Sequence, residues 1–186
     1  MSRAGFVLAG GRSTRMGRDK ALLTAHGSTL LERVAAEVLA AAGNVTVIAP
    51  TERYAGLGIT VVPDLDAGQG PLGGILTALS NTRADWNLIV AVDMPRLNAP
   101  FFSQLFDAAE TSKADCLIPL NAEGRIEPLC GIYSRNCLGT VQKAMEAGIR
   151  KVTSAFEGLR VAHWQPQDVD LFRNLNTPQD WSEHNA

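Results

Sequence analysis

The chain has 186 residues, of which 46% are hydrophobic, and its formal net charge is −2. This length predicts a single domain over residues 1–186 whose core removes about two-thirds of the unfolded surface from water. The charge excludes a general electrostatic attraction to nucleic acid or anionic membranes, and the lack of a long apolar run in the sequence predicts a cytoplasmic protein.

Short, mostly continuous apolar runs alternate with helical patterns along the chain. Runs of this kind are typical of strands that are covered on both faces. They lie at residues 5–9, 45–49, 59–62, 87–92, 115–119 and 129–133. The alternation predicts a three-layer α/β sandwich, with a mainly parallel sheet between two layers of helices. Ligands of such sheets bind beyond the carboxyl ends of the strands.

Five amphipathic or capped segments supply the predicted helices. The first has the clearest boundaries, because Thr29 and Glu32 have the spacing of a capping box and Gly43 follows as a stop signal. The second covers residues 70–81, where Pro71 suits the first helical turn. The other three are predicted over residues 100–110, 134–148 and 177–184.

The loop that follows the first strand reads LAGGRSTRMGRDK at residues 8–20 and combines glycines with cations. Gly10 and Gly11 allow backbone amides to approach a ligand closely and to form an anion nest. Arg15 and Lys20 add full positive charges. The combination favours a nucleoside triphosphate, whereas a surface turn would explain the same residues without a ligand. Spacing excludes both the Walker loop and the GxGxxG dinucleotide fingerprint.

Asp93 is the candidate metal ligand. It follows the apolar run at 87–92 and precedes Met94 and Pro95, where the chain must leave the strand, so we expect its carboxylate at the ligand-binding edge. Mg²⁺ commonly takes one or two protein carboxylates and fills its other positions with phosphate oxygens and water. An aspartate that only opens a turn before proline has the same local pattern. Asp64 ends an earlier apolar run in a similar way.

The segment LAGGRSTRMGRDKALL resembles the N-terminal signature of the molybdenum cofactor guanylyltransferases. Further matches lie at PD (63–64), GPLGG (70–74), VDMP (92–95), EPLCGIY (127–133) and NLNTPQD (174–180). The resemblance implies a Rossmann-like nucleotidyltransferase fold and an Mg²⁺-dependent enzyme that joins GTP to the phosphate of molybdopterin, the molybdenum cofactor. The products are the guanine dinucleotide cofactor and pyrophosphate. Molybdoenzymes or cofactor-delivery proteins are expected as further partners.

The resemblance also implies roles for individual residues. Base selection falls to the backbone of the first strand's end, and the other nucleotide contacts come from charged side chains. The nucleotide set is Leu8, Ala9, Gly10, Gly11, Lys20, Asp64 and Asp93, and the catalytic set is Arg15, Lys20 and Asp93. An acceptor phosphate, with a second pKa of about 6, is already mostly ionised at neutral pH and needs no general base. Positioning and positive charge are therefore expected to supply most of the catalysis.

The acceptor side is read from fewer residues. Asn174 and Asn176 match an NxNTP element that lies near the active site in the family, although both also suit a turn before a helix. Arg150 could receive the anionic molybdopterin or remain a solvated surface charge. One departure is that some relatives place an asparagine at the end of the second strand, where this chain has Ile48 and Ala49.

Two other functions remain open from the sequence. The first is a cytidylyltransferase that acts on molybdopterin or on another phosphorylated metabolite, and Gly10 favours GTP over CTP because related cytidylyltransferases carry LAAG in this position. The second is a nonenzymatic nucleotide-binding regulator. Lys20 and Asp93 together favour the enzyme, because transfer chemistry needs both a cation and a metal ligand.

Overall fold

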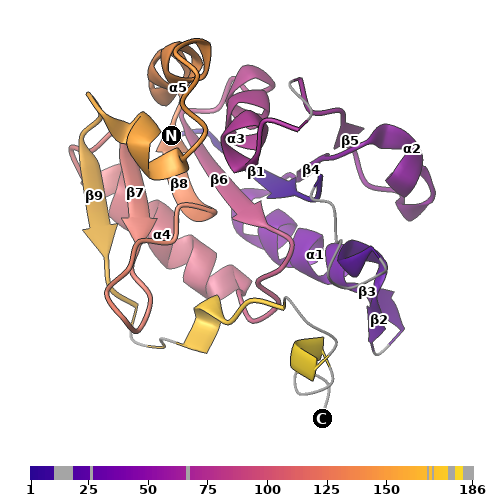
Figure 1. The fold of residues 1–186 in the computed structure, drawn as a ribbon. Helices are drawn as coiled ribbons and strands as arrows, with labels where there is room; N and C mark the ends of the chain where they lie inside the picture. The colour runs from indigo at the N-terminus through magenta and orange to yellow at the C-terminus, as the bar shows by residue number, and fades with distance from the viewer. Residues whose placement is uncertain are drawn as a thin grey trace.

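The computed structural model describes residues 1–10, 19–25, 27–65, 68–166, 168, 170–175 and 179–181. Its centre is a seven-stranded sheet in the order β5-β4-β1-β6-β8-β7-β9 (Figure 1). The strands are β1 (Arg3–Leu8), β4 (Thr46–Ile48), β5 (Val61–Val62), β6 (Trp86–Ala91), β7 (Cys116–Pro119), β8 (Cys130–Ser134) and β9 (Val161–Trp164). Within this sheet β8 pairs antiparallel with β6 and β7, and every other pairing is parallel. The predicted mainly parallel sheet is confirmed.

Helices cover both faces of the sheet. They are α1 (Leu30–Ala42), α2 (Thr51–Tyr54), α3 (Pro71–Ser80), α4 (Ala99–Thr111) and α5 (Cys137–Glu146). Figure 1 shows α1 and α4 together on one face and α3 and α5 on the other, and each pair shares one of two buried apolar clusters with the sheet. The predicted three layers are therefore confirmed. None of the helices in the described residues is both long enough and apolar enough to cross a membrane.

Helix α1 has the boundaries that its capping residues predict. The amide of Glu32 donates to Thr29 Oγ1 at 3.2 Å, and the amide of Thr29 donates to Glu32 Oε2 at 2.7 Å. Gly43 ends the helix with a φ of 77°, a left-handed conformation that glycine adopts without strain. The helix lies very close to β1, because a Cβ added at Gly5 would come within 2.2 Å of Val38 Cγ1. The missing side chain at Gly5 therefore allows α1 to pack closely on the middle of β1.

Some elements differ from the sequence prediction. The edge strand β9 was not predicted, and its four residues are only partly buried or exposed, so no continuous apolar run marks it. The antiparallel pair β2 (Thr24–Ala25) and β3 (Ser28–Thr29) is too short to produce a periodic pattern. Of the helix predicted over 177–184, only residues 179–181 lie in the described part, and these are helical.

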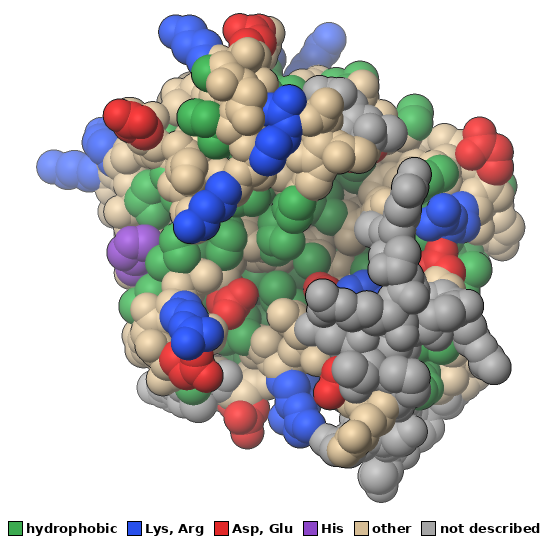
Figure 2. Space-filling view, in the orientation of Figure 1, with side chains coloured by type: hydrophobic (Ala, Val, Ile, Leu, Met, Phe, Trp, Pro, Cys, Tyr) green, Lys and Arg blue, Asp and Glu red, His purple; other side chains and the backbone are tan. Residues whose placement is uncertain are grey.

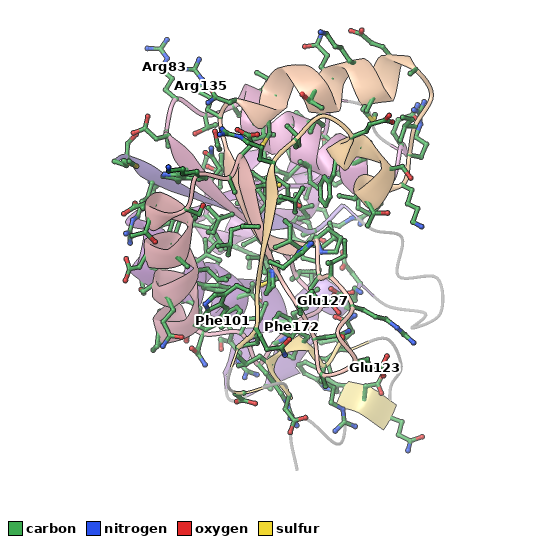
Figure 3. All side chains as sticks on the ribbon, turned by 90° about the vertical axis from the view of Figure 1, so that its left-hand side faces the viewer. Arg83, Phe101, Glu123, Glu127, Arg135 and Phe172 are labelled. Carbon is green, nitrogen blue, oxygen red and sulfur yellow. The ribbon has the colours of Figure 1, made fainter. Side chains whose placement is uncertain are left out.

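The strand directions place several loops at one edge of the sheet. Every strand of the sheet except β8 ends at this edge, and β8 begins there, so the loop between β7 and β8 reaches the same edge. At the end of β9, Trp164 packs on Phe101 of α4 with ring centroids 5.8 Å apart, and Phe101 packs on Phe172 at 5.7 Å (Figure 3). These aromatic contacts anchor the β9 side of the ligand-binding edge.

Candidate active site

A cavity of about 790 Å³ opens at the carboxyl ends of β1, β4 and β6. In Figure 2, hydrophobic side chains gather in the hollowed centre of the face. The cavity contains all the predicted nucleotide residues that the structure describes. These are Leu8, Ala9, Gly10, Lys20, Asp64 and Asp93. Segments far apart in the chain therefore meet at the place that the fold class predicts for a ligand.

The end of β1 is held by its two neighbouring strands. The amide of Ala9 donates to the Ile48 carbonyl at 3.0 Å, and the amide of Val92 donates to the Leu8 carbonyl at 3.1 Å. Among the described residues, a Cβ added at Gly10 would have only the Ile48 carbonyl oxygen within 4 Å, at 3.9 Å. The missing side chain at Gly10 leaves space for a group in the cavity to approach the backbone closely.

Lys20 and Asp93 form an ion pair inside the cavity. Lys20 Nζ lies 2.7 Å from Asp93 Oδ2, and each side chain is about one-fifth exposed, at 19% and 20%. Lys20 begins the short 3₁₀ helix η1 (Lys20–Leu22), while Asp93 lies two residues after the end of β6. The pair brings together a cation and a carboxylate that are 73 residues apart in the chain.

Asp19 holds η1 in place. Its Oδ1 accepts a hydrogen bond from the Ala21 amide at 3.1 Å, which caps the helix, and its Oδ2 accepts one from the Tyr54 hydroxyl at 2.8 Å. Burial raises the pKa of Tyr54 well above its usual value, so this hydroxyl remains a donor. The same hydroxyl lies 3.2 Å from the Ala9 carbonyl, and Arg53 lies 3.5 Å from Asp19 Oδ2. Helix α2 thus links the end of β1 to Asp19, the residue that directly precedes Lys20.

Asp64 also lines the cavity and is positioned by α3. The fully buried Thr77 hydroxyl lies 2.8 Å from Asp64 Oδ1 and also contacts the Gly73 carbonyl at 2.9 Å. Gly70 directly precedes α3 with a φ of 75°, and no side chain caps the first turn of this helix. Gly70, Pro71 and Gly74 all line the cavity, so the first turn of α3 directs its partial positive charge toward a ligand there.

Two predicted acceptor residues lie outside the lining of the cavity. The Arg150 guanidinium donates to the Gln69 side chain and to the carbonyls of Met145 and Ile149, both at 3.0 Å. Arg150 therefore ties the end of α5 to the loop before α3. Asn174 Oδ1 is buried and has no hydrogen-bond partner in the described part of the chain, and the next residue, Leu175, donates its amide to the Asp93 carbonyl at 2.8 Å.

Three other predicted site residues, Gly11, Arg15 and Asn176, lie outside the described residues. At the end of β4, where some relatives are expected to have an asparagine, Ile48 lines the cavity and its carbonyl accepts a hydrogen bond from the Ala9 amide.

The sequence prediction missed the residues that hold the site residues in place. Asp19 has a local signal, because it stands directly before Lys20 where it can cap a helix. Arg53, Tyr54 and Thr77 have no such local signal, because their partners lie between 13 and 45 residues away in the chain.

The sequence analysis included Glu127 only as part of the EPLCGIY motif. Its half-buried carboxylate accepts a hydrogen bond from Asn121 Nδ2 at 2.7 Å, and burial raises its pKa above the usual value.

Comparison with known proteins identifies the family. The MobA-like NTP transferase domain matches residues 5–162. A Nostoc protein named probable molybdenum cofactor guanylyltransferase is 34% identical over 181 residues, which cover 94% of this chain and 86% of that protein. A protein of the same name from Pelotomaculum thermopropionicum is 32% identical over 188 residues, covering 97% of this chain and 90% of that one.

A solved structure agrees with these relatives. The crystal structure of molybdopterin-guanine dinucleotide biosynthesis protein A from Archaeoglobus fulgidus superposes with a TM-score of 0.83 at 25% identity, covering 98% of this chain and 96% of that one. The resemblance of the LAGGRSTRMGRDKALL segment to this family is confirmed, and the alternative of a nonenzymatic regulator is not supported. The chain belongs to the MobA-like NTP transferase family and is a nucleotidyltransferase.

Proposed function

We propose that the chain transfers GMP from GTP to the phosphate of molybdopterin, forming the guanine dinucleotide cofactor and pyrophosphate. An oxygen of the acceptor phosphate attacks the α-phosphorus of GTP, and the bond between that phosphorus and the oxygen bridging to the β-phosphate breaks. The names of the relatives support this pair of substrates. The observation that carries the proposal is the approach of Lys20 Nζ to Asp93 Oδ2, 2.7 Å apart in the cavity that Gly10 also lines.

The described residues suit a triphosphate for electrostatic reasons. Lys20 places an ammonium in the cavity, and the first turn of α3 also lines it and adds backbone amides. A unit charge about 4 Å away contributes about 4 kcal/mol at an effective dielectric constant of about 20. These groups offset the repulsion between two polyanions and the charge that develops on the leaving pyrophosphate. The acceptor phosphate is already ionised, so no side chain has to remove a proton from it.

Mg²⁺ fits the Asp93 carboxylate, which lines the cavity just beyond the end of β6. Carboxylate oxygens are ligands that Mg²⁺ accepts, with phosphate oxygens and water completing its coordination. Asp93 would hold the ion. When bound, the ion supplies positive charge to the phosphates.

Arg15 as a further triphosphate contact, Asp64 at the ribose or metal, and Asn174, Asn176 and Arg150 on the acceptor side belong to the same proposal. Arg150 acts there through the loop at Gln69, because its guanidinium is bonded to that side chain. One domain over residues 1–186, a cytoplasmic location and delivery of the product to molybdoenzymes or cofactor-delivery proteins stay predictions.

The decisive experiment incubates the purified protein with labelled GTP, Mg²⁺ and molybdopterin and measures pyrophosphate and the labelled dinucleotide. We expect both products, in equal amounts, only when all three components are present. A parallel reaction with CTP tests the cytidylyltransferase alternative. Faster transfer from CTP than from GTP, or no dinucleotide from either nucleotide, would overturn the proposal.

A further inference from the structure

The cavity occupies only one half of the ligand-binding edge. Its walls come from the ends of β1, β4 and β6 and from the start of α3, whereas β8 contributes only Leu129, which precedes it. The phosphate of the acceptor must reach the α-phosphorus of GTP. The rest of the acceptor must therefore bind outside the space that the nucleotide occupies. The edge formed by β8, β7 and β9 is the neighbouring surface on the other side of Asp93.

Glu127 lies on this neighbouring surface, in the loop between β7 and β8, and its backbone is held on both sides. Its amide donates to the Pro119 carbonyl at 2.9 Å, and its carbonyl accepts from the Cys130 amide at 3.0 Å. The following residue, Pro128, accepts a hydrogen bond from the buried Tyr133 hydroxyl at 2.5 Å. The side chain of Glu127 therefore extends from a loop segment with little freedom to move.

Only one oxygen of the Glu127 carboxylate has a partner among the described residues. Oε1 accepts from Asn121 Nδ2 at 2.7 Å, while Oε2 makes no hydrogen bond or ion pair with that part of the chain. The side chain is half-buried, and burial together with the nearby Asp93 charge raises its pKa above the usual value. Oε2 is not one of the fully buried unpartnered atoms, so it is open to a ligand and its lone pairs can accept hydrogen bonds from N–H groups there.

Glu123, in the same loop, has the properties of an ordinary surface carboxylate. Its side chain is 62% exposed and lies 2.9 Å from the Arg125 guanidinium. In Figure 3, Glu123 lies farther out along the loop than Glu127. The two glutamates thus differ in burial and partner although they are four residues apart, so Glu123 supplies a matched control.

We propose that Glu127 binds the N–H edge of the acceptor's ring system and orients the acceptor beside Asp93. The inference rests on the proposed function, in which the acceptor is molybdopterin, whose pterin ring carries an amino group and a ring N–H side by side. A carboxylate accepts from two adjacent N–H groups, whereas it repels the phosphate end of the same molecule. Glu127 thereby favours the orientation in which the phosphate points away from it, toward the nucleotide.

The test compares E127Q with the wild-type protein in steady-state transfer and in direct binding of molybdopterin without nucleotide. Glutamine keeps an acceptor for Asn121 and removes the charge. We expect the KM and the dissociation constant for molybdopterin to rise about 10- to 100-fold, the loss typical of a charge-assisted hydrogen bond. The KM for Mg·GTP and the melting temperature should stay near the wild-type values. E123Q should match the wild type in every measurement.

The other outcomes overturn the inference, the proposed function or both, and they can be told apart. An unchanged KM for molybdopterin in E127Q, with or without a lower melting temperature, would leave Glu127 as a brace for its loop. A higher Mg²⁺ concentration required by E127Q than by the wild type would identify Glu127 as a metal ligand instead. If the wild type binds molybdopterin more tightly than E127Q does but transfers no GMP, the proposed function fails while the inference holds. If the wild type neither binds nor uses molybdopterin, both fail.

Discussion

The two halves of the ligand-binding edge hold their loops in the same way but present different charged groups. In the β1–β4 half, the buried Tyr54 hydroxyl contacts Asp19 and the Ala9 carbonyl, and the cavity lining includes the cations Lys20 and Arg53 beside carboxylates. In the β8–β7 half, the buried Tyr133 hydroxyl donates to the Pro128 carbonyl, and the neighbouring charge is a carboxylate.

We infer from this difference that the two halves bind chemically different groups of the substrates. A triphosphate needs cations and free amides fixed before it arrives, because moving them during the reaction would cost free energy. A neutral ring with N–H groups needs an acceptor and an apolar surface instead. Asp93 lies at the boundary between the halves, since it follows β6, which pairs with β1 on one side and β8 on the other.

The largest expected effect comes from Asp93→Asn at this boundary. The variant keeps the shape of the side chain but loses the charge that would hold Mg²⁺, so we expect Mg²⁺-dependent transfer to fall by about 1,000-fold or more. Initial rates of pyrophosphate release measure the loss. Asp85→Asn, just before the opposite end of β6, is the control and should keep its activity. Normal turnover by Asp93→Asn would remove the metal assignment.

Lys20→Ala should have the next largest effect, confined to the nucleotide half. Loss of the ammonium should lower kcat/KM for GTP by about 100-fold or more, because one close positive charge contributes several kcal/mol in a partly buried site. The KM for molybdopterin should change little. Lys143→Ala, on the exposed side of α5, is a matched loss of one lysine. Equal KM and kcat in Lys20→Ala and the wild type would place Lys20 outside the site.

Tyr54→Phe tests the support of the nucleotide half. It removes the donor to Asp19 Oδ2, so the free energy of unfolding should fall by about 1 to 3 kcal/mol. Because η1 is then less well fixed, we expect the KM for GTP to rise about tenfold or less, with an unchanged KM for molybdopterin. Thermal unfolding and steady-state kinetics measure the two effects. A loss of stability without any change in the KM for GTP would separate Tyr54 from nucleotide binding.

Tyr133→Phe makes the corresponding change in the other half. The Pro128 carbonyl loses its donor, and the loop that carries Glu127 becomes less constrained. We expect a loss of stability similar to that of Tyr54→Phe, at about 1 to 2 kcal/mol, and a KM for molybdopterin raised a few-fold. The KM for GTP should not change. If both tyrosine variants altered the same KM, the division of the edge into two binding regions would be wrong.

The smallest effect is a dependence of stability on pH at Glu127. Burial raises its pKa in the folded protein, so the folded state binds this proton more tightly than the unfolded state does. The free energy of unfolding therefore falls as pH rises from the usual pKa of a glutamate through the raised value. E127Q lacks this ionisation, so its stability relative to the wild type should increase over that interval. Denaturant unfolding at a series of pH values measures the difference, and a difference that decreases with pH would contradict it.

Much of the fold was predictable because its signals are local. The capping box of Thr29 and Glu32 and the stop at Gly43 define α1 within a few residues of chain. The fully buried β6 appears as a continuous apolar run. The direction of β8 was not predictable, because an apolar run looks the same in either orientation, and β9 lacks such a run.

The candidate site divides in the same way. Gly10, Lys20, Asp64 and Asp93 were selected from loop composition, strand ends and the family motif, and all four line one cavity. Arg150 was selected as a charge near a helix end, yet its guanidinium is bonded to Gln69 and to carbonyls at the end of α5. Nothing in the residues around Arg150 indicates that bond, because Gln69 is 81 residues away.

The amino-acid sequence by itself determined the periodicity of each segment, the residues that end it, and therefore the α/β class and the edge where a ligand binds. Only the tertiary structure decided that Tyr54 supports Asp19, that Lys20 meets Asp93, and that Glu127 lies half-buried with one oxygen unpartnered. The physical reason is the distance along the chain over which each kind of interaction acts. Caps and periodic patterns act over one or two turns, whereas these contacts form only after strands and helices have packed.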